Sequence, residues 1–82
     1  MKVVKGETEV IFTLHAAFRA EERNVDGKTL RDVVNSGSFE KFGKNGIKII
    51  RNAREGKIVL VGRFLKPNLI KILTVEKSGW HD

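Results

Sequence analysis

Apolar residues change from helical spacing to strand spacing near the middle of this chain. Between residues 14 and 36 they recur three and four positions apart, as in Leu30, Val33 and Val34. From Ser38 onward they fall in short runs rich in Val, Ile and Leu, separated by turn sequences. The pattern predicts two helices followed by an antiparallel meander.

The first helix is expected over residues 14–23. Thr13 is suited to accept a hydrogen bond as its N-cap. Asn24 suits the left-handed position that ends a helix, and Val25 then packs back on it. The second helix is expected over residues 27–36, with Asp26 as N-cap and Gly37 as a left-handed stop.

Turn sequences divide the rest of the chain into strands. An initial strand is expected at 9–12, preceded by a turn around Gly6 that belongs either to a short hairpin or to a frayed lead-in. Residues 39–42 are expected in a short strand or an arm that ends at Gly43-Lys-Asn-Gly46. Further strands are expected at 47–53, 58–65 and 69–77.

The expected fold is therefore α+β: a short N-terminal strand, two helices, and an antiparallel sheet of three to four strands packed on the helices. The length of 82 residues fits one domain, 1–82, with a core of about 9–77 and a tail at 78–82.

Strand register can be predicted from the turns. A two-residue loop at Pro67-Asn68 places Arg63 opposite Ile72 and Val61 opposite Thr74. A loop at Glu55-Gly56 places Arg51 opposite Leu60. One face then carries Ile47, Ile49, Arg51, Ile58, Leu60, Phe64, Leu73 and Val75. The other carries Lys48, Ile50, Asn52, Val59, Val61, Arg63, Ile70, Ile72 and Thr74. The first face is the more apolar and is expected to meet the helices.

The net charge of +6 lies entirely in the second half of the chain. Residues 1–41 hold seven basic and seven acidic residues, whereas residues 42–82 hold nine basic and three acidic residues. A positive second half favours a polyanionic partner such as RNA, DNA, an acidic protein or an acidic membrane surface. The alternative is that basic strands simply keep a small protein soluble.

Several classes of function are excluded or disfavoured by composition. The chain has no cysteine, so disulfides and thiolate metal sites are excluded. No cluster has metal-ligand spacing and no glycine-rich phosphate loop is present, so no metal and no cofactor are expected. No apolar run approaches the ~20 residues that cross a bilayer. The expected location is cytoplasmic, without membrane association.

A histidine and two arginines are aligned on the first predicted helix. His15, Arg19 and Arg23 follow at intervals of four, which places them along one side, and Glu22 returns close to that side. A titratable imidazole beside guanidinium groups suits a site that handles phosphate. The ordinary explanation is a helix-end histidine with surface ion pairs between Glu22 and an arginine.

The order of elements and the motif Phe-Thr-x-His-Ala-x-x-Arg-x-x-Glu-Arg-x-Val, followed by a closing Ile72-Leu-Thr-Val75 strand, resemble small microbial toxin domains. They are similar to the BrnT-like and RelE-like toxin ribonucleases of the barnase–EndoU–colicin–RelE class. The resemblance covers roughly residues 9–77. It departs from the family after Thr-Val, where Glu76 follows, and the chain has no tyrosine, which excludes a tyrosine-dependent mechanism.

The resemblance implies a metal-independent endoribonuclease in which the 2′-hydroxyl attacks the adjacent phosphorus. His15 would be the general acid or base, and Arg19 and Arg23 would bind phosphate. A second cation, Arg63 or Arg51, would lie on the sheet, and Thr74 would orient a phosphate oxygen or the 2′-hydroxyl. A mechanism with two histidines would need His81 of the tail to fold back.

The remaining RNA contacts expected from the sequence are Arg23, Lys48, Arg51 and Lys71. The expected partners are RNA and an acidic antitoxin protein. The alternative is a module without catalysis that binds nucleic acid or an acidic protein through a basic sheet face. Trp80 fits a core cap, a base-stacking residue or a partner anchor equally well.

Overall fold

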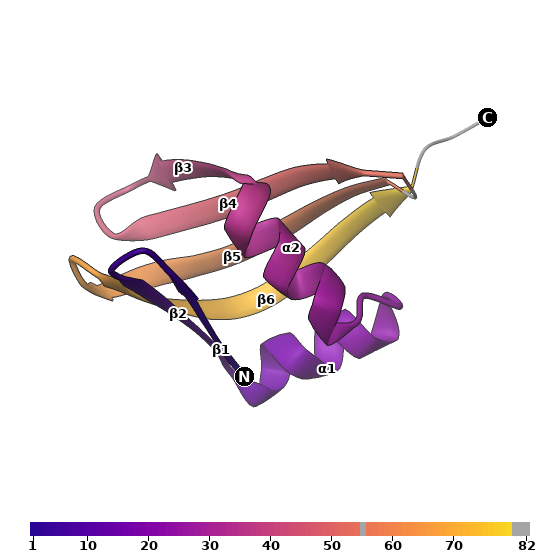
Figure 1. The fold of residues 1–82 in the computed structure, drawn as a ribbon, viewed down its shortest axis with the longest axis horizontal. Helices are drawn as coiled ribbons and strands as arrows, with labels where there is room; N and C mark the ends of the chain where they lie inside the picture. The colour runs from indigo at the N-terminus through magenta and orange to yellow at the C-terminus, as the bar shows by residue number, and fades with distance from the viewer. Residues whose placement is uncertain (55, 80–82) are drawn as a thin grey trace.

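The computed structural model describes residues 1–54 and 56–79, which fold as two helices and one six-stranded sheet (Figure 1). The α+β class expected from the sequence is confirmed. The elements in chain order are β1 (Lys2–Lys5), β2 (Thr8–Phe12), α1 (Leu14–Glu22), α2 (Gly27–Ser36), β3 (Ser38–Phe42), β4 (Gly46–Ala53), β5 (Gly56–Lys66) and β6 (Leu69–Gly79).

The sheet is larger than expected and is mixed rather than antiparallel throughout. Its strand order is β1-β2-β6-β5-β4-β3. The N-terminal residues form a hairpin around Gly6, whose φ is 60°. Its second strand, β2, then pairs in parallel with the start of β6, placing Glu9–Phe12 beside Leu69–Ile72. The expected antiparallel meander is present as β3–β6, but the expected count of three to four strands leaves out β1 and β2, because local periodicity does not reveal this long-range parallel pairing.

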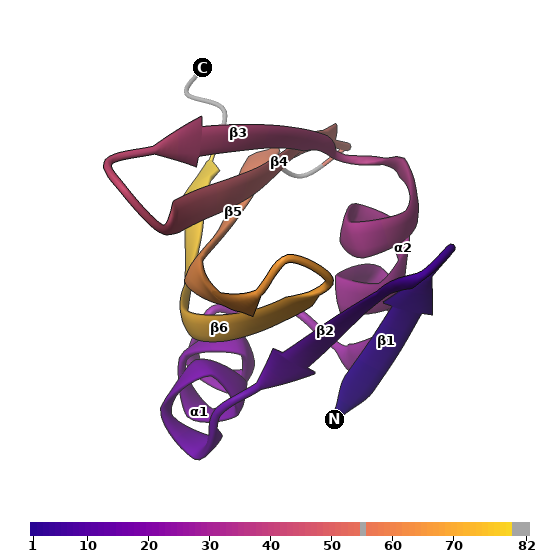
Figure 2. The ribbon, with the colours of Figure 1, turned by 90° about the vertical axis from the view of Figure 1, so that its left-hand side faces the viewer.

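The sheet curves around α2, which contacts β4 on one side and β1 on the other (Figure 2). Helix α1 packs along β6. The core between helices and sheet contains Val3, Val10, Phe12, Ala16, Ala20, Val25, Leu30, Val33, Val34, Ile47, Ile49, Ile58, Leu60, Ile70, Ile72 and Val75. One face of the sheet is thus covered, and the other is left to solvent.

Helix α1 begins and ends at residues with local chemical reasons to do so. The Thr13 side chain accepts a 3.0 Å hydrogen bond from the Ala16 amide. Asn24 has a φ of 57°, and the Val25 amide donates to the Ala20 carbonyl oxygen at 2.8 Å. Val25 is buried. The predicted N-cap, left-handed residue and returning apolar contact are all confirmed.

Helix α2 begins at its predicted N-cap but ends differently. The Asp26 carboxylate accepts a 2.8 Å hydrogen bond from the Thr29 amide. Gly37 has a φ of −76°, so the expected left-handed stop was wrong. A Cβ at Gly37 would approach the Val33 carbonyl oxygen and would lie 2.9 Å from the Ile50 carbonyl oxygen. Close contact with β4, and not backbone conformation, therefore calls for glycine here.

Two register shifts in the β5–β6 hairpin change which residues of β6 face the core. Val61 lies opposite Thr74, as predicted, but Arg63 lies opposite Lys71 instead of Ile72. Leu73 is the extra residue beside Gly62, where a Cβ would lie 3.0 Å from Ile72 Cα. Because of this bulge Ile70 and Ile72 are buried and Leu73 is exposed, the reverse of the predicted faces.

The β4–β5 register is displaced by two residues from the predicted one, with Arg51 opposite Ile58. A displacement of two preserves the face of every side chain, so Arg51 still points toward the helices. Strand β6 extends through Gly79, so Ser78 and Gly79 belong to the sheet and not to a tail. Trp80 and His81 lie outside the described residues. Neither described helix has the length and apolar character needed to span a membrane.

Candidate functional site

The uncovered face of the sheet brings together half of the predicted site residues, namely Lys48, Arg63, Lys71 and Thr74. We call this surface the open face. The register places on it Glu40 and Phe42 of β3, Lys48 and Ile50 of β4, Lys57, Val59, Val61 and Arg63 of β5, and Lys71, Thr74 and Glu76 of β6. The helices pack against the other face.

Three cations of the predicted site lie close together on the open face: Arg63, predicted as a catalytic cation, and Lys48 and Lys71, predicted as RNA contacts. Arg63 lies directly opposite Lys71, and Lys48 lies opposite Val61 on the neighbouring strand. Within residues 1–54 and 56–79, Lys48, Arg63 and Lys71 form no ion pair. Like charges directly opposite one another in a sheet are destabilising. This arrangement therefore favours a bound anion.

An aromatic ring borders these cations. Phe42 is 44% exposed, and its ring lies over Gly46, where a Cβ would meet ring carbons at 2.6 Å. The Lys48 ammonium nitrogen lies 5.5 Å from the ring centroid. An exposed ring next to a cation suits the stacking of a base whose phosphate contacts that cation. Phe42 was not among the predicted site residues, although the face alternation of its strand would have revealed it.

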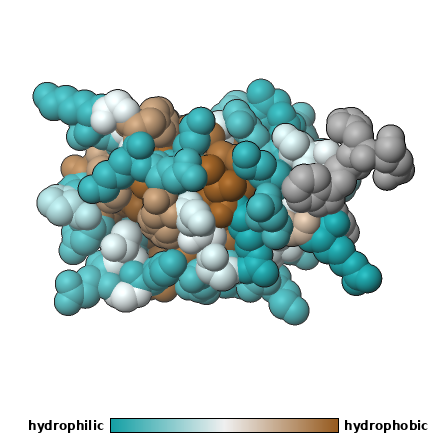
Figure 3. Space-filling view, turned by 90° about the horizontal axis from the view of Figure 1, so that it is seen from above, coloured by the Kyte–Doolittle hydropathy of each residue, from teal (hydrophilic) through white to brown (hydrophobic). Residues whose placement is uncertain are grey.

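Half-buried aliphatic side chains separate the charges on the open face. Ile50, Val59 and Val61 form its centre. Seen from the side on which β3 and β4 lie, apolar surface shows between hydrophilic residues (Figure 3). Thr74, a predicted catalytic residue, lies opposite Val61 and is half-buried. The face thus combines positive charge with apolar contact area.

The predicted histidine–arginine row lies on the side of α1 that faces away from α2. Ala17 and Glu21 line an apolar groove between the two helices, and Ala16 and Ala20 are buried. Helical geometry puts His15 on the remaining side. His15 is exposed, and the described part of the chain offers its imidazole no hydrogen bond or ion pair.

The two arginines of this row differ in their surroundings. Arg19 donates to Glu22 at 3.4 Å, while its Nε atom is buried and lacks an acceptor in the described structure. Arg23 follows the end of α1, and its carbonyl oxygen accepts a 3.4 Å hydrogen bond from the Lys77 ammonium. The Arg19–Glu22 ion pair is the one expected if this row is helix surface and not a phosphate site.

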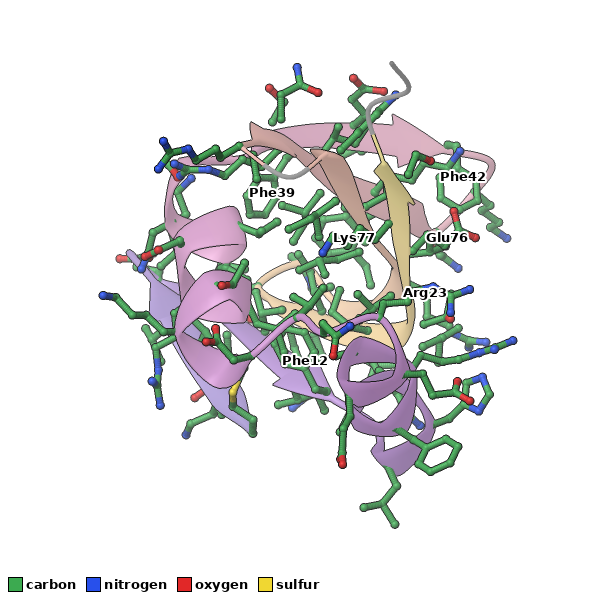
Figure 4. The ribbon with its side chains drawn as sticks, turned by 90° about the vertical axis from the view of Figure 1, so that its right-hand side faces the viewer. Phe12, Arg23, Phe39, Phe42, Glu76 and Lys77 are labelled. Atoms are coloured by element: carbon green, nitrogen blue, oxygen red, sulfur yellow. The ribbon has the colours of Figure 1, made fainter. Side chains whose placement is uncertain are left out.

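Arg23, the last residue of the histidine–arginine row, lies on the same side of β6 as the open face (Figure 4). The Thr13 amide donates to the Ile72 carbonyl oxygen at 3.1 Å, after which the chain enters α1 beside β6. Figure 4 shows Arg23 and Glu76 on the outer side of β6 and Lys77 on its inner side. However, His15, Arg63 and Thr74 line none of four cavities formed by the described residues, of about 310 to 640 Å³.

Arg51 does not join the other predicted RNA contacts. It lies on the covered face, where it donates to the Asp32 carbonyl oxygen of α2 at 3.4 Å. There it lines a polar cavity of about 310 Å³ with Asp26, Asp32 and Lys77. A carbonyl partner and two nearby carboxylates make this position less suited to an anion than the open face.

No group of three or more metal-ligating side chains occurs among residues 1–54 and 56–79. No family model, no curated protein and no solved structure matches the chain. The resemblance to toxin ribonucleases therefore rests on the motif residues quoted above.

Proposed function

We propose that the protein binds single-stranded nucleic acid, RNA in the first instance, on its open face. The observation that carries this proposal is the direct opposition of Arg63 and Lys71 without a neutralising ion pair. Phosphates of a bound strand relieve the repulsion between these cations. The sheet is then a binding platform, and no chemical step is required of it.

The aromatic and aliphatic residues of the open face support a single strand over a duplex. A base stacks on an exposed ring such as that of Phe42 irrespective of sequence. The half-buried side chains of Val59 and Val61 offer apolar contact to further bases. In a duplex the bases are paired and stacked on one another, so neither contact would form.

The test is the salt dependence of binding to a single-stranded RNA oligonucleotide. Contacts from Lys48, Arg63 and Lys71 give a slope of log K against log salt of about −2, at roughly −0.7 for each neutralised phosphate. Arg63→Gln should reduce the slope by about 0.7. Lys28→Gln, which removes one exposed charge from α2, is the matched control and should leave it unchanged. An affinity insensitive to salt overturns the proposal.

A second candidate is the endoribonuclease implied by the resemblance. The buried Nε of Arg19, which lacks an acceptor, favours it, because a phosphate oxygen would satisfy that donor. His15 is exposed nearby on the same side of α1 and is available for proton transfer. On this proposal an acidic antitoxin would neutralise the enzyme by covering its positive surface.

Incubation of RNA with the purified protein in EDTA separates the two candidates. The enzyme proposal expects cleavage that is lost in His15→Ala and reduced in Arg63→Ala. The binding proposal expects intact RNA and an affinity that His15→Ala barely alters. Cleavage that persists unchanged in both variants would point to a contaminating nuclease and rule out the enzyme proposal.

A further inference from the structure

Two hairpin turns meet at one end of the sheet and enclose a cavity. The β3–β4 turn and the β5–β6 turn lie at the same end of the molecule (Figures 1 and 2). The Phe64 amide donates a 2.8 Å hydrogen bond to the Asn45 carbonyl oxygen and ties the two turns together. The cavity has a volume of about 410 Å³. We call it the turn cavity.

The charged groups around the turn cavity are all positive. Lys41, Lys44 and Lys66 line it, and no acidic residue does so. None of the three forms an ion pair within the described ranges 1–54 and 56–79. The Lys41 ammonium nitrogen lies 5.5 Å from the centroid of the Phe64 ring. Three unpaired cations around one recess favour a ligand with more than one negative charge.

The remaining walls of the turn cavity are apolar or backbone. Phe64, Leu65 and Pro67 line one part of it, and Leu65 is 45% exposed. Two glycines, Gly43 and Gly46, leave backbone accessible at another part. A compact anion attached to a flat or apolar group fits these walls better than a free inorganic ion.

The turn cavity and the open face lie on opposite faces of the sheet at the same end. Arg63 and Phe64 are consecutive on β5, so their side chains point to opposite faces. Arg63 belongs to the open face and Phe64 to the cavity. A strand that follows the open face past Arg63 therefore reaches the cavity only by turning around the sheet end. Its terminus makes that turn more readily than an internal segment.

We propose that the turn cavity binds the terminal phosphate of a single-stranded nucleic acid whose following nucleotides lie on the open face. This inference rests on the proposed binding function. A phosphate monoester carries a charge of about −1.5 to −2 at neutral pH, whereas an internal phosphodiester carries one negative charge. The three lysines distinguish a phosphorylated end from a hydroxyl end, and the terminal nucleoside lies against Leu65 and Pro67.

The experiment compares three RNA oligonucleotides of one sequence: one with a 5′-phosphate, one with a 3′-phosphate and one with hydroxyls at both ends. One phosphorylated form should bind the wild-type protein about tenfold more tightly than the hydroxyl form, as expected for charge-assisted hydrogen bonds. Lys44→Gln and Lys66→Gln should each reduce this preference. Lys28→Gln, the matched charge control, should retain it.

The outcomes separate this inference from the proposed function. Equal, salt-dependent binding of all three oligonucleotides by the wild-type protein overturns the terminal-phosphate site and leaves open-face binding intact. A preference that persists in both Lys44→Gln and Lys66→Gln also overturns it, because the phosphate must then bind elsewhere. Absence of binding to any of the three overturns both proposals.

Discussion

Arg63 and Lys71 lie directly opposite one another on β5 and β6, two like charges at facing positions of an antiparallel pair. Facing like charges cost about 0.2–1 kcal/mol of stability relative to a neutral pair. We therefore expect Arg63→Gln to raise the free energy of unfolding slightly at low salt while weakening RNA binding. Urea titration at low and high salt measures the first effect, and the gain should shrink as salt screens the repulsion.

The matched control for the stability gain in Arg63→Gln is Lys57→Gln, which removes a charge from the same strand. Lys57 lies opposite Asn52 on one side and Ser78 on the other, so it faces no cation directly. Its substitution should leave stability nearly unchanged. A loss of stability in Arg63→Gln would contradict the view that this position is maintained for binding.

The Lys77 ammonium reaches inward from β6 and donates a 3.4 Å hydrogen bond to the Arg23 carbonyl oxygen at the end of α1 (Figure 4). A cation at the C-terminus of a helix also interacts favourably with the helix dipole. We expect Lys77→Met to lower the free energy of unfolding by about 1 kcal/mol. Urea unfolding checks this, with the exposed Lys57→Met as control. Equal stability of the two variants would show that this contact contributes nothing.

Gly37 links α2 to β3 and packs against β4, where a side chain has no space. A Cβ would lie 2.9 Å from the Ile50 carbonyl oxygen and 3.1 Å from Ile49 Cγ2. Gly37→Ala should therefore lower the free energy of unfolding by about 1–3 kcal/mol through overpacking. Gly79→Ala is the control, since a Cβ at Gly79 has no atom within 4 Å. Thermal unfolding of both variants would show a large shift for Gly37→Ala alone.

The N-cap of α2 makes a pH-dependent contribution to stability. The hydrogen bond from the Thr29 amide lowers the pKa of the Asp26 carboxyl below its ordinary value of 3.8. The folded protein therefore keeps this carboxylate charged at pH values where the unfolded chain protonates it. The resulting stabilisation is fully present above the unfolded pKa and is lost as the pH falls through the folded pKa.

Asp26→Asn tests this linkage because asparagine keeps an acceptor for the Thr29 amide but does not titrate near this pH. The stability of the wild-type protein relative to Asp26→Asn should be constant near neutral pH and should fall below pH 3.8. Urea midpoints measured for both proteins across this range give the comparison. A difference that does not change with pH would exclude the titration of Asp26 as a source of acid sensitivity.

Local chemistry in the sequence was sufficient to predict where both helices begin and how the first one ends. Thr13, Asn24, Val25 and Asp26 act through neighbours only a few residues away, and all four take the predicted roles. The parallel pairing of β2 with β6 depends on residues about 60 positions apart, and the bulge at Leu73 depends on two strands together. Neither leaves a periodic signal in one segment.

The candidate site could be predicted only in part, because part of it depends on local alternation and part on how distant turns meet. Alternation along the strands correctly places Lys48 and Thr74 on the open face, where they flank Val61 from the two neighbouring strands. The lysines of the turn cavity were missed, although alternate turns of an antiparallel meander meet at one end of a sheet. The β3–β4 turn contains Lys44, and the β5–β6 turn follows Lys66. Two lysines at turns of the same sheet end could therefore have indicated a positive site there.

The two phenylalanines of β3 point to opposite faces of the sheet and provide a matched pair for testing the open face (Figure 4). Phe42 is exposed on the open face, whereas Phe39 lies on the other face beneath the Lys5 ammonium, 4.7 Å from its ring centroid. Phe42→Ala should weaken single-stranded RNA binding by about 1–3 kcal/mol, the contribution of one stacked base.

Phe39→Ala should leave RNA affinity unchanged, since its ring lies on the face away from the bound strand. Fluorescence anisotropy with a labelled oligonucleotide measures both variants across the same series of salt concentrations, because the phosphate contacts depend on salt and the stacking contact does not. Phe42→Ala should also leave the salt slope unaltered while lowering the affinity at every salt concentration. Equal losses of affinity in Phe42→Ala and Phe39→Ala would mean that RNA does not bind on the open face, since only one of the two rings is accessible there.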